Sequence, residues 1–332
     1  MKKTLIAMAV LAASGAAMAQ SNVTLYGIVD AGIGSFKNGA PGSSSETEMR
    51  SGGLSTSRIG FKGTEDLGGG LKAVFKLEAA IDVQAGATRT PYFGRGAYVG
   101  LAGGFGEVNM GKNWTALDDI YGAGNSGFDG SRLAISNIVW ESAGYADIPD
   151  STIKYVSPSF GGFSGAVSYS LDQQGVPPAI LPSTDVTSFQ LSYAAGPIAA
   201  ALGYQQESKG LGVADRKTTM VNGSYDLGVA RLIAAFGTVS GVTGGDKAND
   251  YHVGVDVPLG SALTISGGYA SSKAKTAGVT TSKTDGFGIA AKYSLSKRTT
   301  TYAGYRDADT ENGAGVKTNE RKEFIVGVNH AF

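Results

Sequence analysis

Few side chains in this sequence could carry out catalysis or hold a metal tightly. Its 332 residues include no cysteine and only two histidines, His252 and His330. Without cysteine there is neither a disulfide framework nor a thiolate metal site. His252 shares one face of an alternating segment with Asp256, but that spacing alone does not make a serine–histidine–aspartate triad. The sequence therefore predicts neither an enzyme nor a metalloprotein.

Two short motifs match ligand-binding loops only in part. Residues 122–127 read GAGNSG, but a dinucleotide loop needs a strand before it and a helix after it, and neither is predicted here. Residues 307–313 read DADTENG and begin like an EF-hand, yet Asn312 stands where glycine is required and Thr318 where glutamate is required. We expect no cofactor, although this segment leaves room for weak calcium binding at the surface.

The composition excludes several classes of protein. The 28 basic residues equal the 28 acidic residues in number, which argues against a nucleic-acid-binding protein. Charged residues are only 17% of the chain and aromatic residues 9%, a balance that is atypical of disordered chains. The 51 glycines do not recur every third residue, so the sequence is not collagen-like. After these exclusions, the composition favours a folded domain that is unusually rich in glycine.

The first nineteen residues have the pattern of a secretory signal peptide. Lys2 and Lys3 precede a small-residue apolar stretch over residues 4–17, and Ala-Met-Ala at 17–19 fits a cleavage site. We expect residues 1–19 to be removed and residues 20–332 to form one domain outside the cytoplasm. No later stretch approaches the roughly 20 apolar residues that a membrane helix needs.

The rest of the chain alternates between apolar and small or polar residues with a period of two, which is the signal of a β-strand. Tyr251, Val253 and Val255 share one face, while His252 and Gly254 share the other. The same alternation recurs over residues 163–171, 263–269 and 287–295. No amphipathic helical run is evident, so the sequence predicts an all-β protein.

Turn signals divide this chain into sixteen predicted strands. Short breaks are predicted at 65–70, 102–106, 157–163, 194–198, 226–229, 257–261 and 294–299. Longer polar segments are predicted at 37–52, 84–92, 113–149, 172–185, 207–215, 241–249, 273–283 and 307–320. Short turns at one end and long loops at the other, with an even strand number, are typical of an antiparallel transmembrane β-barrel.

Three features favour a membrane barrel over a soluble sandwich. The strands are near the ten residues that a tilted membrane strand needs. Aromatic residues such as Tyr155, Phe163 and Tyr293 fall near strand ends, as in an interfacial girdle. A sheet of this many strands also needs closure to remove its edges. Its apolar face would then contact lipid and its polar face a water-filled lumen.

Six motifs carry a resemblance to a known family. They are VTLYGIVD at 23–30, SRIGFKGTEDLGGGLK at 57–72, FGRGAYVGL at 93–101, SPSFGGF at 157–163, YSLSKRT at 293–299 and HAF at 330–332. Together they resemble the Gram-negative porins of β-proteobacteria. The resemblance implies a sixteen-stranded barrel in the outer membrane, a homotrimer, passive diffusion of small hydrophilic solutes, and a third loop folded into the lumen.

Strand alternation indicates which charges would line the lumen and narrow it. Apolar neighbours on the opposite face turn Arg58, Lys62, Lys76 and Glu78 inward, and Arg95 matches the inward arginine that the resemblance implies. The loop at 113–149 carries Asp118, Asp119 and Asp129, which we expect to oppose this basic wall. Arg132 and Glu141 of the same loop are interpreted as solvated charges, and Trp114 and Trp140 as residues that pack the loop against the wall.

A run of small residues provides a candidate contact between barrels. Gly94, Gly96, Ala97 and Gly100 would permit close approach of a second copy in the implied homotrimer. The other expected partners are outer-membrane lipids, lipopolysaccharide, and small hydrophilic solutes and ions, with no nucleic acid.

The sequence thus predicts an outer-membrane diffusion channel with weak anion selectivity. Three alternative functions are compatible with the same barrel. A solute-selective channel would need an aromatic track in the lumen, and an outer-membrane enzyme would need a histidine-centred site. An adhesive barrel would depend on its loops rather than on its lumen.

Overall fold

The computed structural model describes residues 22–128, 131–171, 185–208, 214–242 and 245–332, and the expected signal peptide and Asp129 lie outside them. The first nine strands are β1 (Asn22–Gly39), β2 (Glu46–Ser51), β3 (Arg58–Gly68), β4 (Leu71–Asp82), β5 (Ala87–Thr88), β6 (Gly96–Gly103), β7 (Gly106–Lys112), β8 (Thr152–Val156) and β9 (Phe163–Ser170). The other nine are β10 (Asp185–Ala195), β11 (Ile198–Ser208), β12 (Arg216–Asp226), β13 (Arg231–Val242), β14 (Gly245–Leu259), β15 (Leu263–Thr276), β16 (Val279–Ser294), β17 (Thr299–Asn312) and β18 (Lys317–Ala331).

The barrel wall has sixteen strand positions, as the sequence predicts, because two of the eighteen strands do not add a position. Strands β2 and β3 both pair with β1, and together they form the second wall strand, interrupted at residues 52–57. The two-residue β5 pairs only with the end of β4 and lies beside the wall. Apart from the pairing of β1 with β18, all other neighbouring wall strands are antiparallel and consecutive along the chain.

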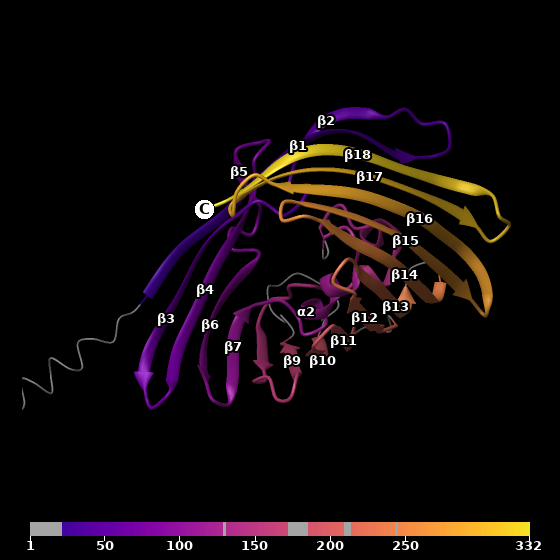
Figure 1. The fold of residues 1–332 in the computed structure, drawn as a ribbon. Coiled ribbons are helices and arrows are strands. Elements are labelled where there is room, and N and C mark those ends of the chain that lie inside the picture. Colours follow the sequence, from indigo (N-terminus) through magenta and orange to yellow (C-terminus); the bar gives the residue numbers. More distant parts are fainter. Residues whose placement is uncertain (1–21, 129–130, 172–184, 209–213, 243–244) are drawn as a thin grey trace, which may run out of the picture.

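The first and last strands close the barrel. Strand β1 pairs with β18 from Ile28 opposite Ala331 to Gly39 opposite Glu320, so no edge of the sheet is left open (Figure 1). A closed sheet satisfies its backbone hydrogen bonds internally, which is what a bilayer requires of a spanning structure. Among the described residues, no helix is long and apolar enough to cross a membrane.

All seven predicted short turns are present at one end of the barrel, the end that also holds Asn22 and Phe332. At the other end, the predicted long loop at 241–249 belongs mostly to β13 and β14, and two further predicted long loops are also wrong. Residues 273–283 and 307–320 mostly continue strands β15 to β18, with only residues 277–278 and 313–316 between the strands. Polar residues there suggested loops, but their backbone hydrogen bonds extend the sheet beyond the apolar zone.

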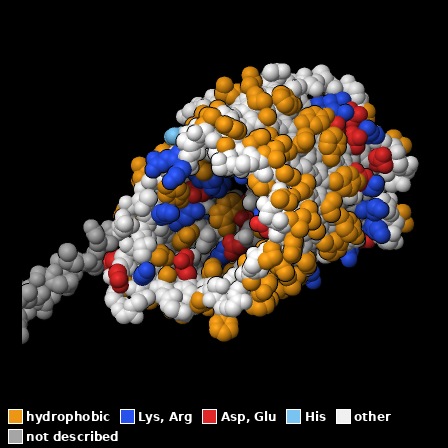
Figure 2. Space-filling view, viewed as in Figure 1, with side chains coloured by type: hydrophobic (Ala, Val, Ile, Leu, Met, Phe, Trp, Pro, Cys, Tyr) orange, Lys and Arg blue, Asp and Glu red, His pale blue; other side chains and the backbone are white. Residues whose placement is uncertain are grey.

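The outer face of the barrel carries many hydrophobic side chains, which Figure 2 shows over the visible wall. Phe61, Val99, Val253 and Ile289 are exposed on it. Aromatic residues of neighbouring strands contact each other near both ends, for example Phe163 with Tyr193 and Phe287 with Tyr305 (ring centroids 4.7 and 6.0 Å apart). This arrangement matches the apolar belt and aromatic girdles of a membrane barrel.

The segment between β7 and β8 lies inside the barrel. It holds two one-turn α-helices, α2 (Asp118–Tyr121) and α3 (Ser136–Val139), and the one-turn 3-10 helices η1 (Gly122–Gly124) and η2 (Glu141–Ala143). Such short helices leave no periodic signal, so the sequence indicated only a loop. We call residues 113–151 the inner loop.

The buried apolar residues lie mainly where the inner loop meets the wall. Leu133 packs against Phe36, Tyr302 and Ile325, and Leu117 and Ile120 pack with Met220. Trp140 packs against Ala270 and Ala308, and its indole Nε1 donates to the carbonyl oxygen of Tyr251 at 3.2 Å. The expectation that Trp140 packs the loop against the wall is confirmed.

Candidate functional site

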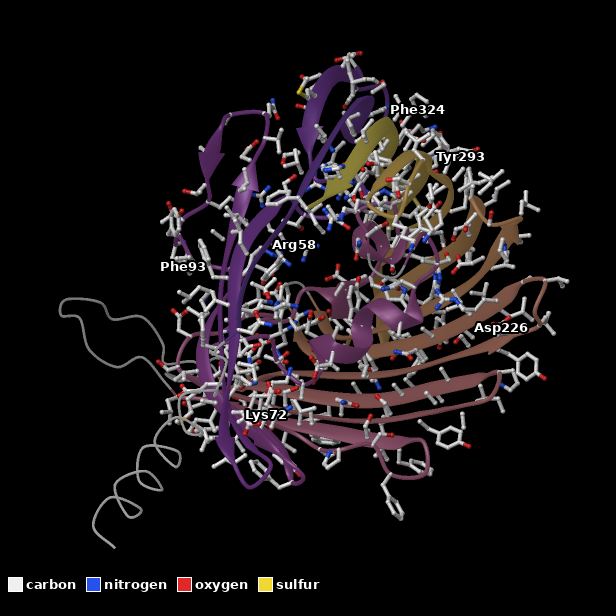
Figure 3. The ribbon with its side chains drawn as sticks, turned by 60° about the vertical axis from the view of Figure 1, so that its left-hand side comes forward. Arg58, Lys72, Phe93, Asp226, Tyr293 and Phe324 are labelled. Atoms are coloured by element: carbon white, nitrogen blue, oxygen red, sulfur yellow. The ribbon has the colours of Figure 1, made fainter. Side chains whose placement is uncertain are left out.

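Three cations surround the buried carboxylate of Glu78 on the inner wall. Arg95 Nε donates to Glu78 Oε1 at 2.8 Å, and Lys76 Nζ lies 3.2 Å from Oε2. Arg58 Nη1 lies 4.0 Å from Oε1. In Figure 3, Arg58 points from β3 toward the interior. Tyr26 completes the set with a hydrogen bond to Glu78 Oε2, so the carboxylate has donors at both oxygens. We call this group the Glu78 cluster.

The β-sheet register brings the Glu78 cluster together. Tyr26 lies opposite Gly60, which lies opposite Glu78, so three adjacent strands supply residues at one height. Arg95 comes one residue before β6, and its backbone N–H bonds to the carbonyl oxygen of Glu78 at 3.2 Å. The prediction that Arg58, Lys76, Glu78 and Arg95 face the lumen is consistent with these contacts.

A second cluster of the same kind lies on strands β17 and β18, and the sequence analysis missed it. Glu323 contacts Arg306, Arg321 and Arg50, with Arg321 Nε at 2.8 Å and Arg50 Nη1 at 3.8 Å. Arg306 also donates to the carbonyl oxygen of Ala134 in the inner loop at 2.9 Å. The alternation of Arg321 and Glu323 with Lys322 and Phe324 could have revealed this Glu323 cluster.

Two further arginines, Arg89 and Arg132, line the same lumen. Arg89 and Arg132 are exposed, and no carboxylate among the described residues lies within 4.0 Å of either guanidinium. Arg132, interpreted from the sequence as a solvated charge, is exposed, and its side chain lines the central cavity. Its position depends on how the inner loop folds, which strand alternation cannot indicate.

Aspartates of the inner loop line the same passage. Asp118 accepts a 2.7 Å hydrogen bond from the hydroxyl of Tyr145, and Asp119 Oδ1 lies 2.6 Å from Lys154 Nζ. Burial within the lumen raises the pKa of Asp118 to about 7, and the neighbouring Asp147 and Asp119 also favour its neutral form. Burial also raises the pKa of Asp119, while Lys154 acts in the other direction.

These groups meet around one open cavity of about 680 Å³. Its charged lining residues are Arg50, Arg58, Arg89, Arg95, Arg132, Arg306, Arg321, Asp118, Asp119 and Asp147. Seven arginines minus three aspartates leave a formal charge of +4 on the lining. Glu78 and Glu323 do not line the cavity, since they lie behind the arginines that they hold. The opening is visible in Figure 2 with blue side chains at its margin.

The two lysines predicted at the constriction lie elsewhere in the lumen. Lys62 and Lys76 line a second cavity of about 360 Å³ with Tyr98 and Glu107, toward the end of the short turns. The ammonium of Lys62 lies 5.3 Å from the centre of the Tyr26 ring. Lys62 and Lys76 therefore face inward, as predicted, but neither lines the cavity that Arg58 and Asp118 share.

His252 holds the inner loop in place rather than serving a reaction. Its Nε2 accepts a 3.0 Å hydrogen bond from the backbone N–H of Ser126, and the N–H of Ser142 donates to Asp250 at 2.7 Å. Asp256 accepts from Ser266, whose hydroxyl in turn accepts from the N–H of Gly127. These polar groups of β14 and β15 hold the inner loop against the barrel wall.

The predicted calcium segment has a different geometry from an EF-hand. Residues 307–318 belong to the β17–β18 hairpin, and Asp309 Oδ2 lies 2.8 Å from Lys317 Nζ. Asp307 Oδ2 lies 3.4 Å from Lys322 Nζ. Among the described residues, no group of three or more acidic, histidine or cysteine side chains could hold a metal ion.

The small residues expected at a contact between barrels divide between the two faces. Gly96 lies opposite Glu78, and a side chain at Gly100 would meet Asn109 on the inner side. Gly96 and Gly100 therefore belong to the lumen face, which corrects the expectation that they would meet a neighbouring copy. Ala97 alternates with them and shares the outer face with Val99. Gly94 lies before β6, close to the carbonyl oxygen of Pro91.

A family model described as Gram-negative porin matches residues 4–313. The chain belongs to the Gram-negative porins. It is 35% identical to Outer membrane porin protein 32 of Delftia acidovorans and 31% identical to an outer membrane porin protein of Bordetella pertussis, and each match covers 100% of both chains. A solved structure titled "Anion-selective porin from Comamonas acidovorans" is 30% identical with a TM-score of 0.80, covering 94% of this chain and 100% of that one.

This membership confirms the predicted fold, location and class of function. The porin is a closed sixteen-stranded barrel of the outer membrane and forms a channel for passive diffusion. It is a channel and not an enzyme. The clusters around Glu78 and Glu323 are therefore parts of a passage for solutes and ions.

Proposed function

We propose that this porin passes small hydrophilic solutes with a weak preference for anions. The observation that carries this proposal is the lining of the central cavity, where seven arginines face three aspartates. Guanidinium groups keep their charge at any physiological pH, and their planar donors are held rigidly by a carboxylate. The selectivity of a wide channel depends on such lining charges and on its width.

The preference is expected to be weak because the charges are divided between two walls. Asp118 and Asp119 face the passage from the inner loop, while Arg58 and Arg95 face it from the barrel wall. Opposed charges create a field across the passage and partly cancel its net charge. Among known structures, the relative from Comamonas acidovorans is titled anion-selective, which supports the same sign here.

The direct test is the reversal potential of the full chain in a planar bilayer under a potassium chloride gradient. We expect stepwise currents with a small reversal potential of the sign that marks chloride as the more permeant ion. A potential of the opposite sign would contradict the proposed selectivity. A folded barrel that carried no ohmic current would contradict an open passage.

We further propose that the porin assembles as a homotrimer in contact with outer-membrane lipids and lipopolysaccharide. Support comes from the apolar outer face, which includes Ala97 and Val99. Residues 1–19 would be removed on export, as their pattern suggests.

A cofactor has no role in the proposed diffusion. Weak calcium binding at Asp307 and Asp309 would have to displace Lys322 and Lys317.

A further inference from the structure

Lysines of adjacent strands face each other at the loop end of the barrel. Lys247 of β14 lies opposite Lys275 of β15, and Lys273 of β15 lies opposite Lys283 of β16. We call these four residues the lysine patch. Figure 2 shows basic side chains along the right-hand edge of the molecule, beyond the hydrophobic side chains of the wall, where these strands end.

Strand alternation places the lysine patch on the outer face. On β14, Asp250 and His252 contact the inner loop, so even-numbered residues face the lumen. Tyr251 and Val253 are exposed toward lipid. Lys247 is also an odd-numbered residue of β14, so it lies on the same outer face. On β15 and β16, Tyr269 and Phe287 are exposed in the same way. Lys273 and Lys275 lie an even number of residues from Tyr269, and Lys283 lies an even number of residues from Phe287. These three lysines therefore also lie on the outer face.

The lysine patch concentrates positive charge at one place on the barrel. Directly opposite residues have Cα atoms about 5 Å apart, and like charges in such pairs destabilise a sheet. Lys283 has Asp285 at 2.5 Å, but no carboxylate among the described residues lies within 4.0 Å of Lys247, Lys273 or Lys275.

On the neighbouring strands β17, β18 and β1, lysines at this end of the barrel pair with carboxylates. There Lys317 pairs with Asp309, Lys322 with Asp307, and Lys37 with Glu320. Cations and carboxylates thus alternate along the same rim outside the lysine patch. The unmatched lysines indicate that an external anion neutralises the patch.

The height of the patch identifies where that anion must lie. Lys247, Lys273 and Lys283 stand four residues beyond the exposed aromatics Tyr251, Tyr269 and Phe287 on their own strands. Four residues span about 13 Å along a strand, or about 10 Å along the membrane normal at the tilt of such barrels. Aromatic girdles mark the edge of the hydrocarbon zone. The ammonium groups therefore lie at the level of lipid headgroups on the loop side.

We propose that the lysine patch binds the phosphate groups of lipid A, the phosphorylated glycolipid anchor of lipopolysaccharide. Its acyl chains would lie on the apolar face below, against residues such as Val253 and Ile289. Lysine is a common ligand of phosphate as a point charge. The inference rests on the proposed contact with lipopolysaccharide and assigns that contact to one place on the barrel.

The test measures lipid binding to the detergent-solubilised full chain by native mass spectrometry, with diphosphoryl lipid A as the probe. The variant K247Q/K275Q removes one facing pair. The matched control K297Q/R298Q removes two positive charges from the turn between β16 and β17, at the opposite end of the barrel. The conservative variant K247R/K275R keeps the charge. Conductance in planar bilayers reports folding separately for every variant.

We expect K247Q/K275Q to bind lipid A at least about tenfold more weakly, with K297Q/R298Q and K247R/K275R close to the wild type. Inorganic phosphate at the same concentration should not displace the lipid. Equal binding by K247Q/K275Q and the wild type would overturn the proposal, as would an equal loss in K297Q/R298Q. Displacement by inorganic phosphate would instead assign the patch to a dissolved anion. Because each variant should conduct normally, a failure of lipid binding is distinct from a failure of the channel.

Discussion

The hydroxyl of Tyr26 donates a 2.7 Å hydrogen bond to Glu78 Oε2 across an intervening strand. The strand between them contributes Gly60, and a Cβ atom at that position would lie 2.5 Å from the Tyr26 ring. The ring therefore lies over a position that has no side chain. The absence of a side chain at Gly60 is what lets Tyr26 reach the carboxylate that also holds Arg95.

Substitution of Gly60 by alanine should release the Glu78 cluster. The new methyl group would displace Tyr26, and overpacking of this kind costs about 1–3 kcal/mol. We expect a lower thermal stability of the folded barrel and a noisier open-channel current, because Arg95 loses a fixed partner. Gly104→Ala is the matched control, since a side chain there meets nothing within 4 Å. Equal behaviour of the two variants would show that Tyr26 does not depend on Gly60.

Neutralisation of Arg58 and Arg95 together should shift the channel toward cations. A unit charge about 10 Å from an ion in water contributes about 0.4 kcal/mol, and salt near 0.1 M screens this to about 0.15 kcal/mol. The contribution has opposite signs for chloride and potassium, so one charge changes their permeability ratio about twofold. The variant R58Q/R95Q should therefore lower the chloride-to-potassium permeability ratio about fourfold, as read from reversal potentials. The variant K297Q/R298Q, altered far from the cavity, should retain the original ratio. An unchanged ratio in R58Q/R95Q would remove both arginines from the constriction.

Arg132 should contribute to selectivity without contributing to stability. It lines the cavity, and no carboxylate among the described residues lies within 4.0 Å of it. We expect R132Q to reduce anion preference about twofold while the unfolding temperature stays unchanged. Arg306 provides a contrast, since it contacts both Glu323 and the carbonyl oxygen of Ala134. R306Q should therefore reduce stability as well, and equal unfolding temperatures for R306Q and the wild type would contradict this distinction.

The selectivity of the channel should depend on pH near neutrality. Because burial raises the pKa of Asp118 to about 7, this carboxyl is mainly charged at pH 8 and mainly neutral at pH 6. Loss of one negative charge from the lining should increase anion preference about twofold as the pH falls over this range. D118N should show the stronger preference already at pH 8 and a much smaller change with pH. A full pH response in D118N would assign the titration to another group, with Asp119 the first to examine.

The sequence alone determined the barrel because its signals are local. Alternation in segments such as residues 251–257 sets which side chains share a face, and glycine or proline marks six of the seven short turns. The same alternation placed Arg58, Lys76 and Glu78 on the lumen face. The extensions of β15 to β18 were missed because their polar residues resemble loop residues, whereas their pairing across strands keeps them extended.

Only the tertiary structure decided which lumen charges meet. The Glu323 cluster joins Arg50 to Arg306 and Arg321, residues separated by most of the chain, because β1 closes on β18. Arg132 reaches the cavity because Leu133 and Trp140 seat the inner loop in apolar pockets of the wall. Such contacts depend on barrel closure and on the path of an irregular loop, and neither has a periodic signal in the sequence. The physical reason is that the face on which a side chain lies depends on its neighbours along the chain. Which charges line the constriction depends instead on distances across the lumen, between residues far apart in the sequence.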